Sequence, residues 1–158
     1  MIVLDLETTG FNPRKDKIID IAALRINRGK IVDSFVTLIN PKIPIPFKIT
    51  SLTHISQQDV KDAPTFDKVS SNLLKFMRGH RIIGYNISFD KRFLVKSERR
   101  FSCLTYFDYL KFIRGLDYEM DNYKLKTVTN YFGIHKKPTH RALADAETLV
   151  ELIRILGT

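Results

Sequence analysis

The sequence predicts an α/β protein in which a mixed five-stranded sheet is flanked by helices. Two observations favour this fold class. The first third of the chain reads as strands joined by short turns, whereas the remainder alternates between helical and strand patterns. The expected strands are the apolar runs 2–7, 18–26, 31–39, 81–85 and 102–106.

The first three strands are expected to form an antiparallel meander. Segments 18–26 and 31–39 are separated by residues 27–30, and this four-residue break contains Gly29, as is typical of a hairpin turn. Residues 40–46 then hold three prolines. We expect an extended loop there, because proline has no N–H to donate to a sheet and restricts the residue before it.

Helices are expected where apolar residues recur at steps of three and four. Pro64 and Thr65 open such a segment, whose buried face would consist of Phe66, Val69, Leu73, Phe76 and Met77. Further helices are expected over 89–97, 109–114, 123–132 and 141–156. Gly133 ends the third of these, as glycine often does after a helix.

Length and charge limit the classes of function. The chain of 158 residues suits one domain, which we expect over 1–158. It carries 26 basic against 17 acidic residues, a formal net charge of +9. A basic domain often meets nucleic acid or another anionic surface, and general solubility explains the same balance equally well. The position of the few acids therefore matters more than their number.

Cysteine content and hydropathy bear on the compartment. Cys103 is the only cysteine, which excludes an internal disulfide and fits a reducing environment. No run of about 18 or more apolar residues is present, as a membrane-spanning helix would need. The first residues also lack the basic start and long apolar region of a secretory signal. We therefore expect a cytoplasmic protein.

Asp5 and Glu7 stand at the end of the first predicted strand. Side chains alternate along a strand, so these carboxylates point one way while Leu4 and Leu6 point the other. Two carboxylates about 6 Å apart repel by about 3 kcal/mol at an effective dielectric constant of roughly 20. Water, basic neighbours, a shared proton or a bound cation must offset this repulsion. A solvated strand end with two surface acids fits the same pattern.

Two further acids stand near the starts of predicted helices. Asp90 follows the apolar run 81–85, where a carboxylate can also act as a helix cap. Asp145 lies among three alanines in the first turns of the last helix, so little side chain shields it. His140 is expected on the loop that enters this helix, where it can swing over a site that Asp145 lines. The alternative is an exposed loop histidine without a role.

Three motifs occur in a fixed order: residues 5–10 (DLETTG), 86–90 (NISFD) and 140–146 (HRALADA). With them the sequence resembles the DEDDh group of 3′–5′ exonucleases, and most strongly the proofreading type of bacterial DNA polymerase III. Stretches such as 52–55 and 61–66 also look like this family, so the similarity spans nearly the whole chain. The resemblance implies a ribonuclease H-like fold, in which parallel strands extend the antiparallel meander.

The resemblance also implies two bound Mg²⁺ or Mn²⁺ ions and a histidine that acts as general base. The metal ligands would be Asp5, Glu7, Asp90 and Asp145, and His140 would take a proton from the attacking water. Hard divalent cations prefer oxygen ligands, and carboxylates without a Cys or His ligand set argue against zinc. An unperturbed imidazole titrates near neutrality, which suits a general base.

The implied substrate is the 3′ end of DNA, single-stranded or frayed, which would be shortened to nucleoside 5′-monophosphates. A DNA polymerase is the implied protein partner. The expected substrate contacts are Thr8, Thr9, Leu52, Thr53, Asn86, Phe89, Lys136 and Lys137. Core packing explains Phe89 and Leu52 equally well. The basic residues between Lys91 and Arg100 are expected to form only a solvated helix face.

Departures from the family pattern leave alternatives open. Tyr85 stands where a histidine commonly precedes the motif asparagine, and His54 stands where the family often has glycine. Thr8 stands where oligoribonucleases tend to carry methionine, which favours the DNA-directed type over an RNA-directed relative such as oligoribonuclease or ribonuclease T. A non-catalytic binding module would be marked by the loss of an acid or of the histidine, and all five are present.

The chain ends directly after the last predicted helix. A stand-alone nuclease and a polymerase-associated one therefore both stay open.

Overall fold

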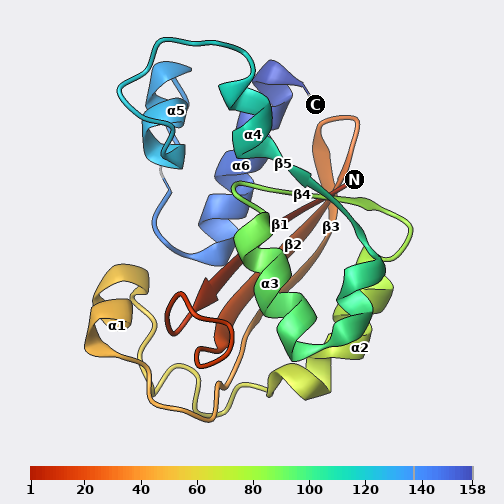
Figure 1. The fold of residues 1–158 in the computed structure, drawn as a ribbon, viewed down its shortest axis with the longest axis vertical. Helices are drawn as coiled ribbons and strands as arrows, with labels where there is room; N and C mark the ends of the chain where they lie inside the picture. Colours follow the sequence, from red (N-terminus) through yellow and green to blue (C-terminus); the bar gives the residue numbers. More distant parts are fainter. Residues whose placement is uncertain (137, 158) are drawn as a thin grey trace.

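The computed structural model describes residues 1–136 and 138–157, and a five-stranded sheet forms its centre (Figure 1). The strands are β1 (Ile2–Thr8), β2 (Ile18–Asn27), β3 (Lys30–Leu38), β4 (Arg81–Gly84) and β5 (Thr105–Asp108). They lie in the order β3-β2-β1-β4-β5. The first three strands pair antiparallel, whereas β4 runs parallel to both β1 and β5. The predicted mixed sheet is confirmed, and β1 occupies its middle position.

Helices pack on both faces of this sheet. They are α1 (Phe47–Thr53), α2 (Phe66–Met77), α3 (Ser88–Ser97), α4 (Tyr109–Arg114), α5 (Leu125–Tyr131) and α6 (Ala142–Leu156). The expected helices match α2, α3, α4 and α6 closely, and α5 is shorter than the expected 123–132. Among the described residues, no helix is long and apolar enough to cross a membrane.

The strand expected over 102–106 is present as β5, but its bounds are wrong. A 3₁₀ helix, η1 (Arg99–Cys103), occupies the first two residues of that stretch, and β5 begins only at Thr105. The carboxylate of Glu98 accepts a hydrogen bond of 3.1 Å from the Arg100 amide, which caps the start of η1. Phe101 is fully buried and anchors the turn in the core.

The sequence does not predict α1. This helix is only seven residues long and begins directly after Pro46, in a proline-rich stretch. Only Ile49 and Thr53 are buried in it. Two buried positions are too few to show a helical period, so the local pattern reads as loop.

The side chains of β1 divide between two apolar cores, as strand alternation requires. Ile2, Leu4 and Leu6 pack in the core that includes residues of α2 and α3, and Figure 1 shows α3 crossing in front of the sheet. Val3 packs in the other core, which α6 dominates. The odd-numbered residues of β1 therefore face α6, and this face carries the acids of the first motif.

Candidate active site

The end of β1 presents Asp5 and Glu7 on the side of the sheet that faces α6. Both side chains are half-buried, whereas Leu4 and Leu6 between and beside them are buried. The predicted alternation is confirmed. Strand β4 pairs with β1 only at Ile2 and Val3, so the carboxyl-terminal half of β1 has no strand neighbour on that side.

Asp90 takes the position beside β1 that β4 leaves open. Its side chain is only 4% exposed, and its Oδ1 accepts a hydrogen bond of 3.1 Å from the Leu6 N–H. The carboxylate thus accepts a hydrogen bond from the β1 backbone at a position where β4 no longer pairs with β1. Gly84 permits this approach, because a Cβ there would lie 3.0 Å from the Leu4 carbonyl oxygen and closer still to Ile87.

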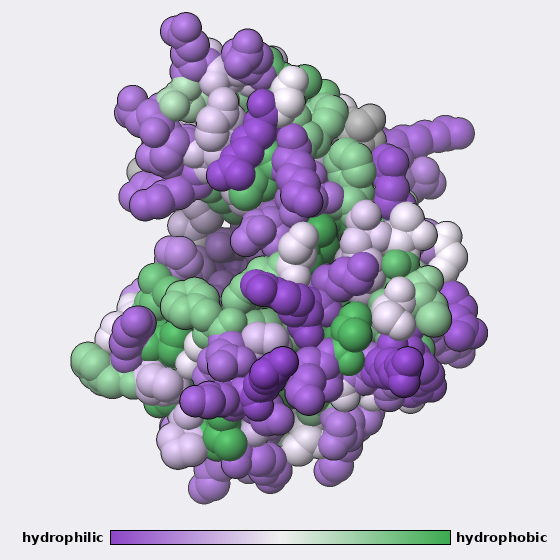
Figure 2. All heavy atoms as spheres, viewed as in Figure 1, coloured by the Kyte–Doolittle hydropathy of each residue, from purple (hydrophilic) through white to green (hydrophobic). Residues whose placement is uncertain are grey.

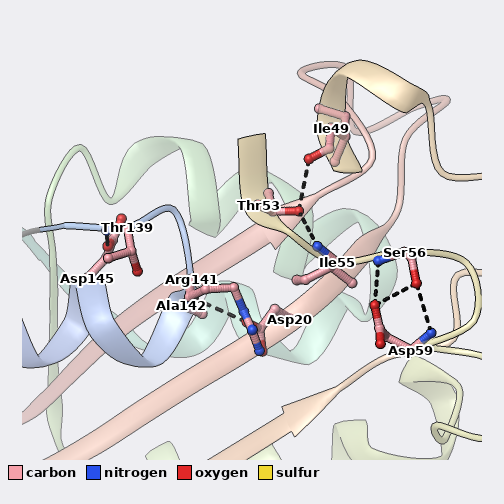
Figure 3. A network of polar contacts seen from close by, with 10 residues as sticks. All are labelled: Asp20, Ile49, Thr53, Ile55, Ser56, Asp59, Thr139, Arg141, Ala142 and Asp145. Atoms are coloured by element: carbon pink, nitrogen blue, oxygen red, sulfur yellow. Dashed lines mark hydrogen bonds and ion pairs between the residues drawn. The ribbon is translucent and has the colours of Figure 1, made fainter. Parts of the chain in front are cut away.

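Asp145 and His140 reach the same place from the start of α6. The Thr139 N–H donates a hydrogen bond of 2.8 Å to Asp145 Oδ1, which folds the entering loop over the helix (Figure 3). His140 has a positive φ of 56° and an exposed side chain. Its ring nitrogen and carboxylate oxygens of Glu7 and Asp145 lie within 4.8 Å of one another. The second and third motifs are therefore both brought to β1.

The electrostatics of this cluster favour a bound cation. Burial, and next the charges of Asp145 and Asp20, raise the pKa of Glu7 to about 8. Burial also raises the pKa of Asp90 to about 8. Burial, and next the charge of Asp90, raise the pKa of Asp5 well above its ordinary value. Several half-buried carboxylates that repel one another fit a divalent cation, whose charge would offset the repulsion.

The types of ligand atom in the cluster indicate which cations it could bind. Four carboxylates suit Mg²⁺ or Mn²⁺. The nitrogen of His140 also lies among the candidate ligand atoms, and imidazole with carboxylates suits zinc as well. The sequence argument against zinc, which counted no histidine ligand, is weaker in the folded protein.

Asp20 is a site residue that the sequence analysis missed. It lies on β2 and is only 3% exposed. Its Oδ2 accepts hydrogen bonds from Arg141 Nε (3.2 Å) and from the Ala142 N–H (3.3 Å), at the start of α6 (Figure 3). Burial raises the pKa of Asp20, while the bond and charge of Arg141 act in the opposite direction.

This contact holds the start of α6 against β2, next to His140 and Asp145. The signal in the sequence was a single acid inside the apolar run 18–24. An acid in such a run is ordinary on an edge strand or a strand that faces solvent, but a buried acid needs a partner. Its partner lies 121 residues away, so no local pattern could identify it.

The hydroxyls of the expected threonine contacts are engaged within the protein. Thr8 Oγ1 donates to the Gly10 carbonyl at 2.6 Å, and Thr9 Oγ1 donates to Asp16 at 3.3 Å. Thr53 is 1% exposed and donates to the Ile49 carbonyl at 2.9 Å (Figure 3). The protons of these three hydroxyls are therefore already donated within the protein.

Leu52, Asn86 and Phe89 lie in different settings. Leu52 is 41% exposed on α1. Asn86 is exposed, and its positive φ of 62° turns the chain from β4 into α3. Phe89 is half-buried and packs against Phe11 and Phe93, with ring centres 6.3 and 5.0 Å away. Phe89 thus combines core packing with partial exposure, and Leu52 is free at the surface.

The basic residues before His140 give a mixed outcome. Lys136 Nζ forms an ion pair of 2.6 Å with Glu147 on α6, so its charge is partly compensated. Lys137 lies outside the described residues. Tyr85, which departs from the family pattern, donates a hydrogen bond of 2.6 Å to the Tyr123 carbonyl. It ties β4 to the segment before α5 and is not part of the acidic cluster.

A hollow opens on the face shown in Figure 2, between the part of the molecule that carries α1 and the part that carries α5. The end of β1 and the start of α6 lie between these two parts (Figure 1). The acidic cluster is therefore placed where a flexible ligand can enter from solvent.

Comparison with known proteins agrees with this geometry. A family model described as exonuclease (RNase_T) matches residues 2–153. A DNA polymerase III of PolC type from Caldanaerobacter subterraneus is 38% identical over 154 residues, which are 96% of this chain and 11% of that protein. The epsilon subunit of DNA polymerase III from Aquifex aeolicus is 32% identical over 98% of this chain and 79% of its own length. The chain thus spans about a ninth of the PolC-type relatives.

Solved structures share the fold at lower identity. Escherichia coli exonuclease I in complex with a dA16 oligonucleotide has a TM-score of 0.85 and 18% identity, over 98% of this chain and 40% of that one. Exonuclease X in complex with 5′ overhanging duplex DNA has a TM-score of 0.76 and 22% identity, over 99% and 93%. From the family match and the Aquifex relative, this chain belongs to the RNase_T exonuclease family, which hydrolyses phosphodiester bonds and includes the epsilon subunit of DNA polymerase III.

Proposed function

We propose that this chain is a two-metal-dependent 3′–5′ exonuclease that shortens single-stranded or frayed DNA 3′ ends to nucleoside 5′-monophosphates, as a proofreading nuclease does. One observation carries the proposal: Glu7, His140 and Asp145 meet within 4.8 Å, at the end of a strand that also carries Asp5 and contacts Asp90. Three distant motifs thus supply acids and a base to one point.

The four carboxylates would hold the two metal ions, and Mg²⁺ or Mn²⁺ is the proposed choice. Bound divalent cations would neutralise charge on the scissile phosphate and stabilise the leaving oxygen. Asp5 and Glu7 project side by side from β1, Asp90 approaches from α3 and Asp145 from α6. The ligands would come from three elements that the two cores hold against one sheet, and such support keeps a site rigid.

His140 is the proposed general base, which accepts a proton from the attacking water. Its side chain is exposed, so it can reach a substrate, and its ring nitrogen lies within 4.8 Å of carboxylate oxygens of Glu7 and Asp145. The residues on both sides of His140 are anchored. The Thr139 N–H donates a hydrogen bond to Asp145, and Arg141 donates one to Asp20.

Substrate and partner rest on the relatives. The relatives' names associate them with DNA polymerase III, and this supports DNA as substrate and a polymerase as partner. A cytoplasmic location and a domain that extends over residues 1–158 belong to the same proposal. The basic net charge of +9 suits a polyanionic substrate.

Labelled strands test this proposal directly. The protein is incubated with 3′- and 5′-labelled single strands of DNA and of RNA, in Mg²⁺, Mn²⁺ or EDTA. We expect release of mononucleotides from the 3′ end of DNA, with either metal and not with EDTA. A preference for RNA would show that RNA, not DNA, is the substrate. Cleavage without metal, or no cleavage at all, would overturn the proposal.

A further inference from the structure

A basic groove of about 590 Å³ opens between the β1–β2 loop and α3. Its charged lining consists of Arg14, Lys91, Arg92, Lys96 and Arg99, and no acid contributes to it. Arg92 and Lys96 lie four positions apart and share one face of α3. Lys91 precedes Arg92 on the same helix, and Arg99 follows on η1. Figure 2 shows hydrophilic side chains gathered over α3 on this side of the molecule.

The charges of the groove are not compensated from within the protein. In the part of the chain that the structure describes, the ion pairs to carboxylates are those of Arg25, Arg100, Lys136, Arg141 and Arg154. The three acids nearest to these cations in sequence are engaged elsewhere. Asp16 accepts a hydrogen bond from the Asn12 N–H, Asp90 is buried against β1, and Glu98 binds Arg100. Lys91 Nζ lies 5.0 Å from the centre of the Tyr106 ring, which carries no charge. Because no ion pair to a carboxylate involves the five groove cations in the described part of the chain, they attract an anionic ligand or a counterion atmosphere.

The segments that line the groove also carry residues of the candidate active site. Lys91 directly follows Asp90 on α3, and Arg14 lies on the loop that follows Glu7 and Thr8. The ring of Phe11 meets that of Phe89 at 6.3 Å and joins this loop to α3. The groove and the acidic cluster are therefore built in part on the same two segments, α3 and the chain that leaves β1.

The loop that carries Arg14 is held in one shape. Asp16 Oδ2 accepts a hydrogen bond of 2.8 Å from the Asn12 N–H, and the Arg14 N–H donates to Asn12 Oδ1 at 3.0 Å. Gly10 packs so closely on Asp16 that a Cβ would lie 2.5 Å from its carboxylate. Asp16 is thus turned toward its own loop, and Arg14 lines the groove.

We propose that this groove binds the phosphodiester backbone of the single strand on the 5′ side of the nucleotide that is removed. The inference rests on the proposed function, because it needs the 3′ end to occupy the acidic cluster. A row of cations without base-edge donors fits a repeating anion and takes any sequence, as a nuclease that degrades strands requires. An acidic protein segment is the competing ligand, and the salt dependence below separates the two.

Binding in EDTA tests the groove without any catalysis. Thymidine oligonucleotides of two and of eight nucleotides are titrated against the wild type, the Arg92→Gln/Lys96→Gln variant and a control, Lys75→Gln/Arg78→Gln. The control removes two exposed cations from the end of α2, outside this groove. Each phosphate contact on a single strand contributes about 0.7 to the slope of log K against log salt.

The groove variant should bind the eight-nucleotide strand about 25-fold more weakly than the wild type at about 0.1 M salt, with the salt slope reduced by about 1.4. The wild type should gain affinity as the strand is lengthened, and the groove variant should lose most of that gain. The control should match the wild type.

An unchanged salt slope or an equal loss in the control would overturn the inference, and so would a wild type that gains nothing from strand length. Cleavage of the same strand in Mg²⁺ is scored separately. Absent cleavage would overturn the proposed function, whereas the EDTA titration decides the groove by itself.

Discussion

Asp90 and Lys91 are neighbours on α3, yet they belong to oppositely charged regions. Asp90 is 4% exposed and faces β1, where carboxylates from three elements converge. Lys91 is exposed and opens the basic groove. The buried acids repel one another strongly and suit a compact, highly charged cation. The exposed cations are hydrated and screened by salt, so their repulsion is weak, and they suit an extended polyanion. Orientation toward or away from the sheet, not position in the sequence, separates the two roles.

The largest expected effect comes from removing a charge in the acidic region. Asp5→Asn should abolish metal-dependent cleavage, because it removes a proposed ligand. The same change should stabilise the protein in EDTA by about 1 kcal/mol or more, because it removes a carboxylate whose pKa is raised first by burial and then by repulsion from the neighbouring acids. Chemical denaturation measures the second effect.

Asp33→Asn is the matched control for this change. Asp33 is exposed and paired with Arg25 at 3.0 Å, so its loss should lower the free energy of unfolding by less than about 1 kcal/mol. A destabilising Asp5→Asn in EDTA would contradict the view that the acids of the cluster repel one another.

Substitution of His140 should separate cleavage at the acidic cluster from binding at the basic groove. His140→Ala should lower single-turnover cleavage by about 10²- to 10⁴-fold, because a general base is lost. Binding of an oligonucleotide in EDTA should change little. His135→Ala, an exposed histidine on the same loop, should cleave as the wild type does. Near wild-type turnover of His140→Ala would remove the residue from the proposed mechanism.

Asp20 is expected to act by positioning, with a smaller effect. Asp20→Asn removes the charge that holds Arg141 and the start of α6, so Mn²⁺ affinity measured by calorimetry should fall by about 10-fold or more. Asp20→Glu should recover part of this loss, since it keeps the charge. Unchanged Mn²⁺ affinity in Asp20→Asn would limit the contact to a structural role.

The pH dependence of stability is the smallest expected effect. In the metal-free protein the pKa of Glu7 is about 8, against an ordinary value of 4.5. The folded state therefore keeps a proton that the unfolded chain has released, and stability falls as pH rises through this window. Melting temperatures in EDTA should fall by a few degrees from pH 5 to pH 8, less steeply in Glu7→Gln. An equal slope in both proteins would contradict the raised pKa.

Much of the fold and site was readable from local patterns. Alternation along β1 predicted that Asp5 and Glu7 share a face, and the helical period predicted α2 over the observed residues. Such patterns work because a strand or helix repeats its buried side at a fixed interval. Where an element is too short to repeat, as in α1 and η1, the prediction was missing or wrong.

The sequence by itself determined the mixed sheet, the order of its chemical motifs and the residues at the candidate metal cluster. Only the tertiary structure decided which side chains meet. Asp20 and Arg141 are 121 residues apart and join at 3.2 Å, and Arg14 and Arg99 come from separate elements to line one groove. The physical reason is that a sequence period reports which face of an element is buried, whereas distances between faces depend on how the elements pack around a shared core.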